Sequence, residues 1–460
     1  MPLFPGGFSP GDFTPGPVPM HGIASRGDLP LPFSFVVAGA ALALIVSFVV
    51  LLFAWRRPRF AAVGGRPVPG LQRIVDNRGV RLGASLLVLA LYLWVGLALV
   101  AGQDRLTNPA FGFVFVWVWV GVVPVSLLFG PIWRATNPLR TIHAGLTSLA
   151  RVDPDDGLAS LPSRLGVWPA AAGLFAFAWL ELVQPDRTTL SVLRLWVLAW
   201  LLILILGAVI FGRRWIGAAD PFETYASTVA QLSPWHRVSG QLRLVNPLAG
   251  LNAWTPPPGT PAVVAVLLGS TAFDSFANTT WWISTVQDSN VSPVIWETGG
   301  LLIMIVIIFA TFCAAAAWMG RYLARGRPEG DQRVGAVELP RMMAGSLVPI
   351  VIGYAIAHYF TLLVVEGQRT ALALSDPLGL GWDVFGTAEG GVDARIFEQP
   401  TLIAAIQLLA IIGGHILGIV SAHEKSVSLL APDRALAGQW PMLVVMVFYT
   451  CSGLVLLFSP

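Results

Sequence analysis

The sequence predicts an all-α protein, a polytopic bundle of about ten transmembrane helices. Hydrophobic residues make up 55% of the chain and charged residues only 12%, whereas soluble proteins carry about 25% charged residues. Apolar runs long enough to cross a bilayer recur along the whole chain, and arginines mark every second connection between them. The composition excludes a water-soluble globule and predicts a multi-pass protein of the inner (cytoplasmic) membrane.

A single transmembrane domain is expected to follow an irregular arm. Residues 1–32 are rich in proline and glycine and lack the features of a signal peptide, so we expect them to remain attached on the outer side. Residues 33–460 contain the apolar runs, each close to the roughly 20 residues that cross the hydrocarbon core. The expected helices are 33–55, 83–102, 111–133, 166–184, 192–212, 261–283, 294–318, 342–365, 400–421 and 437–458.

The basic residues predict which side of the membrane each connection faces. Arginines concentrate after the first, third, fifth, seventh and ninth runs, and Lys425 is the only lysine. Because basic loops stay on the cytoplasmic side, both termini are expected on the outer side. The pI of about 9.1 therefore reflects topology, and no nucleic-acid partner is expected. The acidic outer connection 366–399 is rich in turn residues and is expected to form an ordered cap that could cover an opening.

Two similar segments predict an internal parallel repeat of helices two to three and four to five. FGPIWRATNPLRTI at 129–142 matches FGRRWIGAADPFETY at 211–225. Asn137 or Asp220 suits a helix N-cap, and Pro138 or Pro221 suits the first helical position. Each cap is expected to begin a short amphipathic helix that lies along the inner interface. Parallel repeats occur in transporters and also in membrane proteins that transport nothing.

Ionisable residues within the membrane are costly, so each is a candidate functional residue. At a rise of about 1.5 Å per residue, Asp274, His358, Gln407 and Tyr449 lie roughly 10 to 14 Å below the outer boundary. Asp274 suits a general base or metal ligand, His358 a ligand or acid/base partner, and Tyr449 an orienting hydrogen bonder. The alternative is a buried Asp–His hydrogen bond that only fixes helix packing.

Further polar residues are expected to line an outward-facing cavity around this layer. Tyr354 shares a helix face with His358, and Asn278 lies in the stretch of small and polar residues that surrounds Asp274. His415, roughly 20 Å down, follows two glycines and suits an interhelical hydrogen bond. The predicted cavity residues are Tyr354, Gln407, Asn278, Glu181, Glu297 and His415.

Few cofactors suit this residue set. A divalent metal held by Asp274 and His358 stays open, and His21 in the arm could fold onto the outer opening. A haem between His358 and His415 is disfavoured because their depths differ. Cys313 and Cys451 each fall in an apolar run, so no disulfide framework is indicated. The chain also contains no Walker A, GxSxG or HExxH motif.

Five segments together resemble a family of bacterial, largely actinobacterial, membrane proteins named fenitrothion hydrolase. They are HGIASRGDLPLP, FGPIWRATNPLRTI, STAFDSF, SLVPIVIGYAIAHYF and GGHILGIVSAHEKS. The resemblance implies hydrolysis of a lipophilic organophosphate triester, with Asp274 and His358 in a water-activating or metal-holding role. In related sequences the HG element begins the mature chain, whereas an arm precedes His21 here, which argues against a role for a free N-terminal histidine.

The alternative function is that of a transporter, permease or accessory membrane subunit without catalytic activity. The repeat, the small-residue helix around Asp274 and the acidic outer loop favour this alternative. Both functions imply contact with the lipid bilayer and a small-molecule ligand, while protein partners are left open by the sequence.

Overall fold

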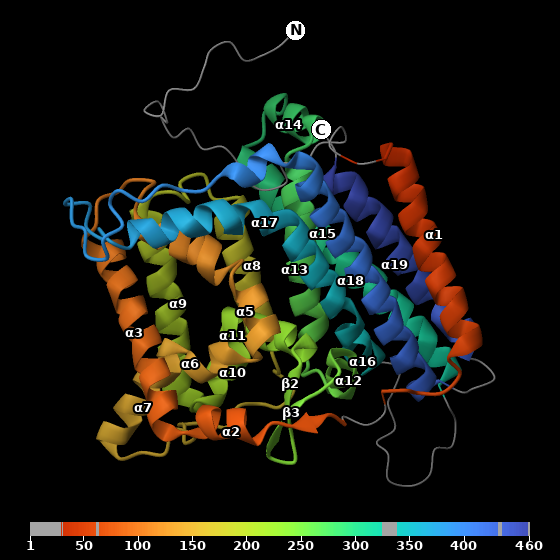
Figure 1. Cartoon of the computed structure of the whole chain (residues 1–460), viewed down its shortest axis with the longest axis horizontal. Helices are drawn as coiled ribbons and strands as arrows, with labels where there is room; N and C mark the ends of the chain where they lie inside the picture. The colour runs from red at the N-terminus through yellow and green to blue at the C-terminus, as the bar shows by residue number, and fades with distance from the viewer. Residues whose placement is uncertain (1–28, 30, 61–63, 324–337, 431–434, 459–460) are drawn as a thin grey trace.

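The computed structural model describes residues 29, 31–60, 64–323, 338–430 and 435–458 (Figure 1). Within these residues the chain is mostly helical, and eight helices are long and apolar enough to cross a membrane, as expected of a multi-pass membrane protein. A bent helix pair would make nine, and the shorter apolar helix α8 (Trp168–Leu182) stands at a further predicted position. The count of ten stays a prediction. The eight long helices are α1 (Phe33–Ala54), α3 (Arg78–Ala101), α9 (Leu190–Phe211), α13 (Thr260–Ala277), α15 (Pro293–Met319), α17 (Val348–Ala373), α18 (Pro400–Leu429) and α19 (Ala435–Leu457).

The peripheral helices present apolar side chains to their surroundings. In the most apolar windows of α1, α3 and α9, only 28%, 17% and 22% of the residues are buried, against 72% in α13 and in the segment ending with α17. So much exposed apolar surface is stable in lipid rather than in water. α13 and α17 therefore form the enclosed centre. Large exposed side chains on the peripheral helices include Phe35, Leu42, Phe53, Leu87, Leu93, Leu195 and Ile203.

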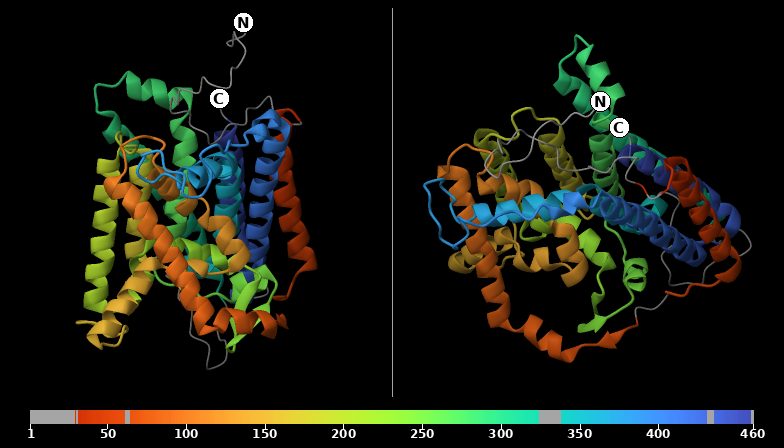
Figure 2. Two further views of the ribbon diagram at one scale, coloured as in Figure 1. Left: turned by 60° about the vertical axis from the view of Figure 1, so that its left-hand side comes forward. Right: turned by 45° about the horizontal axis from the view of Figure 1, so that its top comes forward.

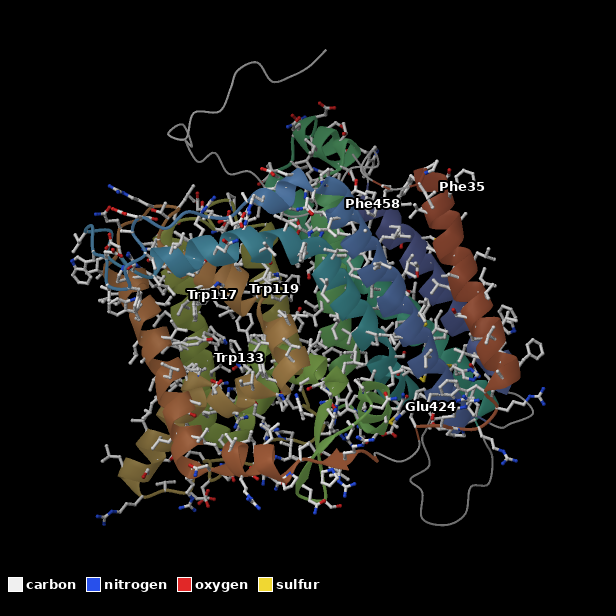
Figure 3. All side chains as sticks on the ribbon, viewed as in Figure 1. Phe35, Trp117, Trp119, Trp133, Glu424 and Phe458 are labelled. Atoms are coloured by element: carbon white, nitrogen blue, oxygen red, sulfur yellow. The ribbon has the colours of Figure 1, made fainter. Side chains whose placement is uncertain are left out.

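The helices form two groups at opposite edges of the molecule, which are connected along the lower side in Figure 1. α1 packs against α18 and α19 at one edge, whereas α3 stands at the opposite edge with α9 (Figure 1). The chain between them follows the base through the exposed amphipathic helix α2 (Pro69–Asp76), as Figure 2 also shows. Phe35 and Phe458 lie on one face of the molecule and Glu424 on the other (Figure 3). We call the first face the α14 face, because α14 (Thr280–Gln287) projects from it, and the second the sheet face, because the β-sheet lies on it.

The third predicted span is broken, so the prediction of one helix over 111–133 is wrong. A π-helical turn, η2 (Phe113–Val118), precedes α5 (Val122–Phe129), and the two parts are bent by 47°. A Cβ at Gly121 would lie 2.5 Å from the Trp117 carbonyl oxygen, so the break requires glycine there. π-Helical turns are often found at functional sites.

The sixth span also ends earlier than predicted, since α13 stops at Ala277 rather than near residue 283. Asn278 Nδ2 donates to the Asp274 carbonyl at 2.7 Å, and the Thr279 hydroxyl accepts from Trp282 N at 3.4 Å as the N-cap of α14. Polar side chains that bond to the nearby backbone compete with helix continuation. The two residues therefore separate α13 from α14, which turns away from the bundle (Figure 1).

A small antiparallel sheet on the sheet face modifies the all-α prediction. Its strands β1 (Arg66–Pro67), β2 (Trp235–Val238) and β3 (Gln241–Leu244) have the order β1-β3-β2. Ser239 and Gly240 join β2 to β3 with φ values of 50° and 80°, which suit a tight hairpin turn. The remaining short helices are α4 (Pro109–Gly112), α6 (Ile132–Thr136), α10 (Arg214–Ala219), α12 (Pro247–Ala253), α16 (Leu339–Met343), η3 (Ala230–Leu232), η4 (Gly320–Tyr322), η6 (Ala344–Leu347) and η7 (Arg395–Glu398).

The two helices predicted to lie along the inner interface differ. α7 (Pro138–Ala150) buries only its first two residues, as an interfacial helix would. In α11 (Pro221–Val229), by contrast, every residue except Ser227 is buried, so the interfacial prediction is wrong there. Phe222 packs 5.1 Å from the Phe177 ring and Tyr225 lies 5.5 Å from the Trp119 ring, between centroids. Aromatic contacts with α8 and with the bend after η2 therefore hold α11 inside the bundle.

The acidic connection begins later than predicted, because α17 continues to Ala373. Its turns are ordered by carboxylates: backbone N–H groups, that of Ala388 first, and the Ser375 hydroxyl lower the pKa of Asp383. The Gln103 amide donates to the Gly379 carbonyl at 2.8 Å. The loop therefore caps the end of α3 at the α14 face (Figure 1).

Candidate functional site

Asp274 and His358 form a direct hydrogen bond inside the helix bundle. His358 Nε2 lies 2.7 Å from Asp274 Oδ2, and the two side chains are 2% and 7% exposed. The Ser275 hydroxyl oxygen lies 3.4 Å from the other ring nitrogen, Nδ1. The imidazole thus has a carboxylate on one side and a hydroxyl on the other. In catalytic triads the carboxylate orients the imidazole, which acts as the base that activates the hydroxyl nucleophile.

Close helix packing holds this arrangement in place. Asn278 bonds to the carbonyl group of Asp274, at the end of α13. A Cβ at Gly269 would lie 2.7 Å from the backbone of α15, and one at Gly353 would lie 2.4 Å from the Ala410 carbonyl oxygen on α18. Small residues allow such close backbone approach in membrane bundles. The pair is therefore held by packed helices rather than by loops.

The depth of the pair below the membrane boundary stays a prediction, but the helix ends differ from those used to estimate it. Asp274 is three residues before the end of α13, which corresponds to roughly 4.5 Å along the axis. His358, in contrast, is 15 residues before the end of α17 at Ala373. Asp274 therefore lies near the end of α13 from which α14 leads to the α14 face (Figure 1).

Two buried tyrosines extend the polar cluster. The Tyr359 ring lies edge-on to His358 with 4.7 Å between centroids, and the Tyr225 ring lies 5.5 Å from that of Trp119. The carboxylate of Glu181 lies within electrostatic range of both tyrosines. The cluster therefore brings together side chains of α8, α11, α13, α17 and the bend after η2.

Sequence reasoning treated Ser275 only as one of the small and polar residues around Asp274, and it missed Tyr359 and Tyr225. Ser275 and Tyr359 directly follow Asp274 and His358 in the chain, so the neighbours of each ionisable residue carried a usable signal. Nothing in the sequence indicated that Tyr225 belongs to the site, because the polar residues around it favoured an interfacial helix.

The other residues of the predicted polar layer bond elsewhere. The Tyr449 hydroxyl lies 2.7 Å from that of Thr311 and donates to the Ile308 carbonyl at 2.9 Å, so it connects α19 to α15. His415 Nδ1 lies 2.9 Å from the Ile411 carbonyl oxygen one turn earlier. The buried polar atoms without a hydrogen-bond partner among the described residues include Tyr354 Oη, Gln407 Oε1 and His415 Nε2.

The remaining candidates are distributed widely. Glu297 is half-buried in the second turn of α15, and His21 lies outside the described residues. Across the described residues, no group of three or more His, Cys, Asp or Glu side chains is placed to hold a metal ion. Asp274 and His358 are turned toward each other instead, so the residues do not fit a metal centre and we derive no step through one.

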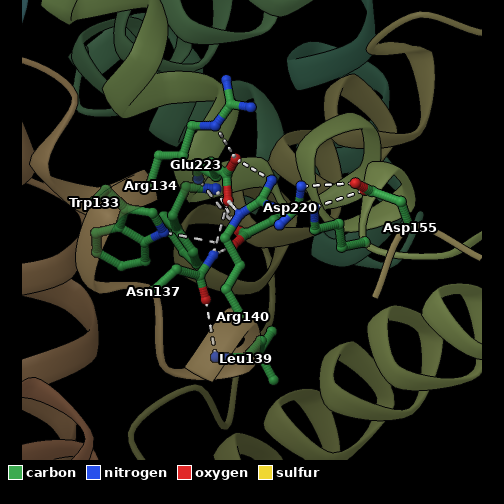
Figure 4. Close-up of polar contacts among 10 residues, drawn as sticks. Trp133, Arg134, Asn137, Leu139, Arg140, Asp155, Asp220 and Glu223 are labelled. Carbon is green, nitrogen blue, oxygen red and sulfur yellow. Dashed lines mark hydrogen bonds and ion pairs between the residues drawn. The ribbon is translucent and has the colours of Figure 1, made fainter. Parts of the chain in front are cut away.

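A second polar cluster lies where the two similar sequence segments meet (Figure 4). Asn137 and Asp220 are N-caps, with Pro138 and Pro221 at the first helical positions of α7 and α11. The caps also bond to each other, since Asn137 Nδ2 donates to Asp220 Oδ2 at 2.7 Å. Burial first, and then the Glu223 carboxylate, raises the pKa of Asp220 to about 7.

The next matched pair in these segments forms a bidentate salt bridge. Arg140 donates to Glu223 through Nε at 2.7 Å and Nη2 at 2.6 Å, and the Glu223 side chain is only 3% exposed. Asn137 Nδ2 also donates to Glu223, at 3.0 Å. Equivalent positions of the two segments thus carry opposite charges that pair across the interface, a signal present in the aligned sequences. Whether the surrounding helices form a repeat stays a prediction.

Compared with known proteins, the chain matches no family model, no curated protein and no solved structure.

Proposed function

We propose that this chain is a hydrolase embedded in a bacterial inner membrane, and that it cleaves lipophilic organophosphate triesters at the α14 face. The single observation that carries the proposal is the arrangement of Asp274, His358 and Ser275, in which one imidazole faces a carboxylate and a hydroxyl. The resemblance to fenitrothion hydrolases suggests the substrate class. The arginine distribution suggests that the α14 face is the outer one.

In the proposed reaction Asp274 accepts the Nε2–H of His358 and so directs Nδ1 at the Ser275 hydroxyl. Nδ1 takes the hydroxyl proton while Oγ bonds to phosphorus, and the bond from phosphorus to the aryl oxygen breaks. The nitrophenolate leaves with the electron pair and receives the proton from the imidazolium. Water then attacks phosphorus in the phosphoserine ester and loses its proton to Nδ1. The bond from phosphorus to Oγ breaks and the imidazolium returns the proton to Oγ, which releases the diester and restores Ser275.

The Ser–His separation of 3.4 Å is longer than a reactive hydrogen bond. Such contacts are often loose without substrate and tighten when it binds. Burial of the pair beside Tyr359 and Trp119 also lowers the local dielectric constant, which strengthens the attraction between Asp274 and the imidazolium formed in the reaction.

The test is release of nitrophenol from fenitrothion or parathion by the purified chain in detergent. Asp274→Asn, His358→Ala and Ser275→Ala are each expected to lower the rate by about 10² to 10⁴. Ser284→Ala on exposed α14 and His143→Ala on α7 are the matched controls and are expected to keep the rate. A rate no higher than that of heat-inactivated protein, or one that the three variants leave intact, would refute the proposal.

Transport is the second candidate function, and broken helices favour it. The bend between η2 and α5 and the break after α13 both lie beside the polar cluster, and transporters often place such breaks at the substrate site. Reconstituted vesicles that accumulate intact triester or a related solute, without releasing nitrophenol, would support transport. Vesicles that stay tight to the solute would argue against it.

A further inference from the structure

A cavity of about 610 Å³ lies at the sheet face, lined along α11 by Thr224, Ser227 and Thr228 but not by Tyr225. Side chains of α11, α10 and α6–α7 line it together with the start of α13. Its volume lies within the range of about 300 to 1,000 Å³ that is usual for small-molecule sites. The cavity is therefore large enough for a phosphate-bearing headgroup or solute.

The charged lining of this cavity is positive. Four arginines face two carboxylates, which leaves a net charge of +2. Glu223 pairs with Arg140 at 2.6 Å, and Asp155 pairs with Arg213 at 2.6 Å. Two arginines therefore keep binding capacity for another anion. They are Arg134, which lies 3.8 Å from Glu223 and is 67% exposed, and Arg214, which has no ion-pair partner among the described residues.

A buried hydroxyl adds a second, independent observation. Thr224 lines the cavity and is only 7% exposed, yet its hydroxyl has no hydrogen-bond partner within the described part of the chain. A buried polar atom without a partner costs free energy, so a ligand in the adjacent cavity that bonded to this hydroxyl would remove that cost. The neighbouring Thr228 hydroxyl is already used, since it donates to the Thr224 carbonyl at 2.8 Å.

We propose that this cavity binds a phosphate group, carried either by a phospholipid headgroup or by a free phosphorylated solute. Guanidinium groups match the geometry of phosphate oxygens, and the Thr224 hydroxyl supplies a neutral donor at the buried end. If the sheet face is cytoplasmic, as the arginines predict, anionic headgroups and phosphorylated solutes are both present there. The proposal does not depend on hydrolysis, because it uses none of the residues around His358.

The test measures binding of two probes to the purified full chain in detergent: inorganic phosphate and dioctanoyl-phosphatidylglycerol, by isothermal titration calorimetry. Arg134→Gln/Arg214→Gln is expected to weaken binding at least about tenfold, since the two positive charges of the lining that keep binding capacity are removed. Arg73→Gln/Arg81→Gln is the control, because these arginines are exposed on the same face but lie outside the cavity. Thr224→Val is expected to weaken binding severalfold, while Thr224→Ser keeps it.

The two probes distinguish the sources of the phosphate. Saturable binding of the lipid, alone or more tightly than inorganic phosphate, would assign the site to a headgroup. Binding of inorganic phosphate without tighter binding of the lipid would assign it to a free phosphorylated solute. Circular dichroism and the thermal midpoint of each variant show whether it is folded. The proposal is overturned if neither probe binds saturably to folded wild-type protein, or if the cavity double variant binds no more weakly than its control.

Discussion

Replacing Glu223 with alanine is expected to destabilise the fold by about 2 to 3 kcal/mol. Removing one partner of a buried ion pair typically costs about 3 to 5 kcal/mol, because the other charge is left without compensation. Two features reduce that cost here. Arg140 is 19% exposed and can regain some hydration, and loss of Glu223 relieves its repulsion of Asp220. The loss of the Asn137 hydrogen bond acts in the opposite direction.

A double-mutant cycle measures this pair directly. Unfolding free energies come from reversible SDS titration in mixed micelles, for Glu223→Ala, Arg140→Ala and the double variant. The pair of Arg213 and Asp155 is the matched control, since both its hydrogen bonds are 2.6 Å long but its side chains are 53% and 38% exposed. We expect a coupling energy of about 2 kcal/mol for the buried pair and below about 1 kcal/mol for the exposed one. Equal coupling in the two cycles would show that burial is not what strengthens the Glu223 pair.

Three further expectations concern the helix contacts and pH. Tyr449→Phe is expected to lower the unfolding free energy by about 1 kcal/mol while triester turnover is unchanged; reduced turnover at unchanged stability would instead place this hydroxyl in the reaction. Because burial raises the pKa of Asp220 from 3.8 to about 7, the folded chain binds this proton more tightly than the unfolded chain. The unfolding free energy should therefore fall as pH rises from about 4 to about 7, with a weaker slope in Asp220→Asn, and equal slopes would contradict the assignment. Gly353→Val is expected to cost about 1 to 3 kcal/mol by overpacking against α18, whereas Gly413→Ala, where a Cβ has nothing within 4 Å, should cost little in the same SDS titration.

The positions of most long helices follow from the sequence alone. The helix predicted at 33–55 is found at Phe33–Ala54, and the helix predicted at 192–212 is found at Leu190–Phe211. This agreement has a physical cause, since only a continuous apolar helix satisfies its backbone in lipid. The break after α13 arises instead from local bonds of Asn278 and Thr279 to the backbone, which hydropathy does not register. The π-helical turn η2 had no signal in the sequence that we could use.

The candidate site was predictable only in part, because helix rise gives depth but not direction around the helix axis. Asp274 and His358 were placed at one depth and do meet. Tyr449 was placed at the same depth, yet its hydroxyl turns to α15. At the sheet face, Glu223 suggested an interfacial helix because its partner, Arg140, lies 83 residues earlier in the chain. A polar residue whose charge is compensated by a distant segment cannot be distinguished locally from one that faces water.

α11 connects the two candidate sites physically. Thr224 and Thr228 line the basic cavity, while the neighbouring Tyr225 packs against Trp119 and lies within electrostatic range of Glu181. Every residue of α11 except Ser227 is buried, so the cavity and the polar cluster are both built on one closely packed helix. The same packing explains why a segment with buried Asp220 and Glu223 carboxylates is tolerated inside the bundle: its cost is offset by contacts that also position Tyr225 in the polar cluster.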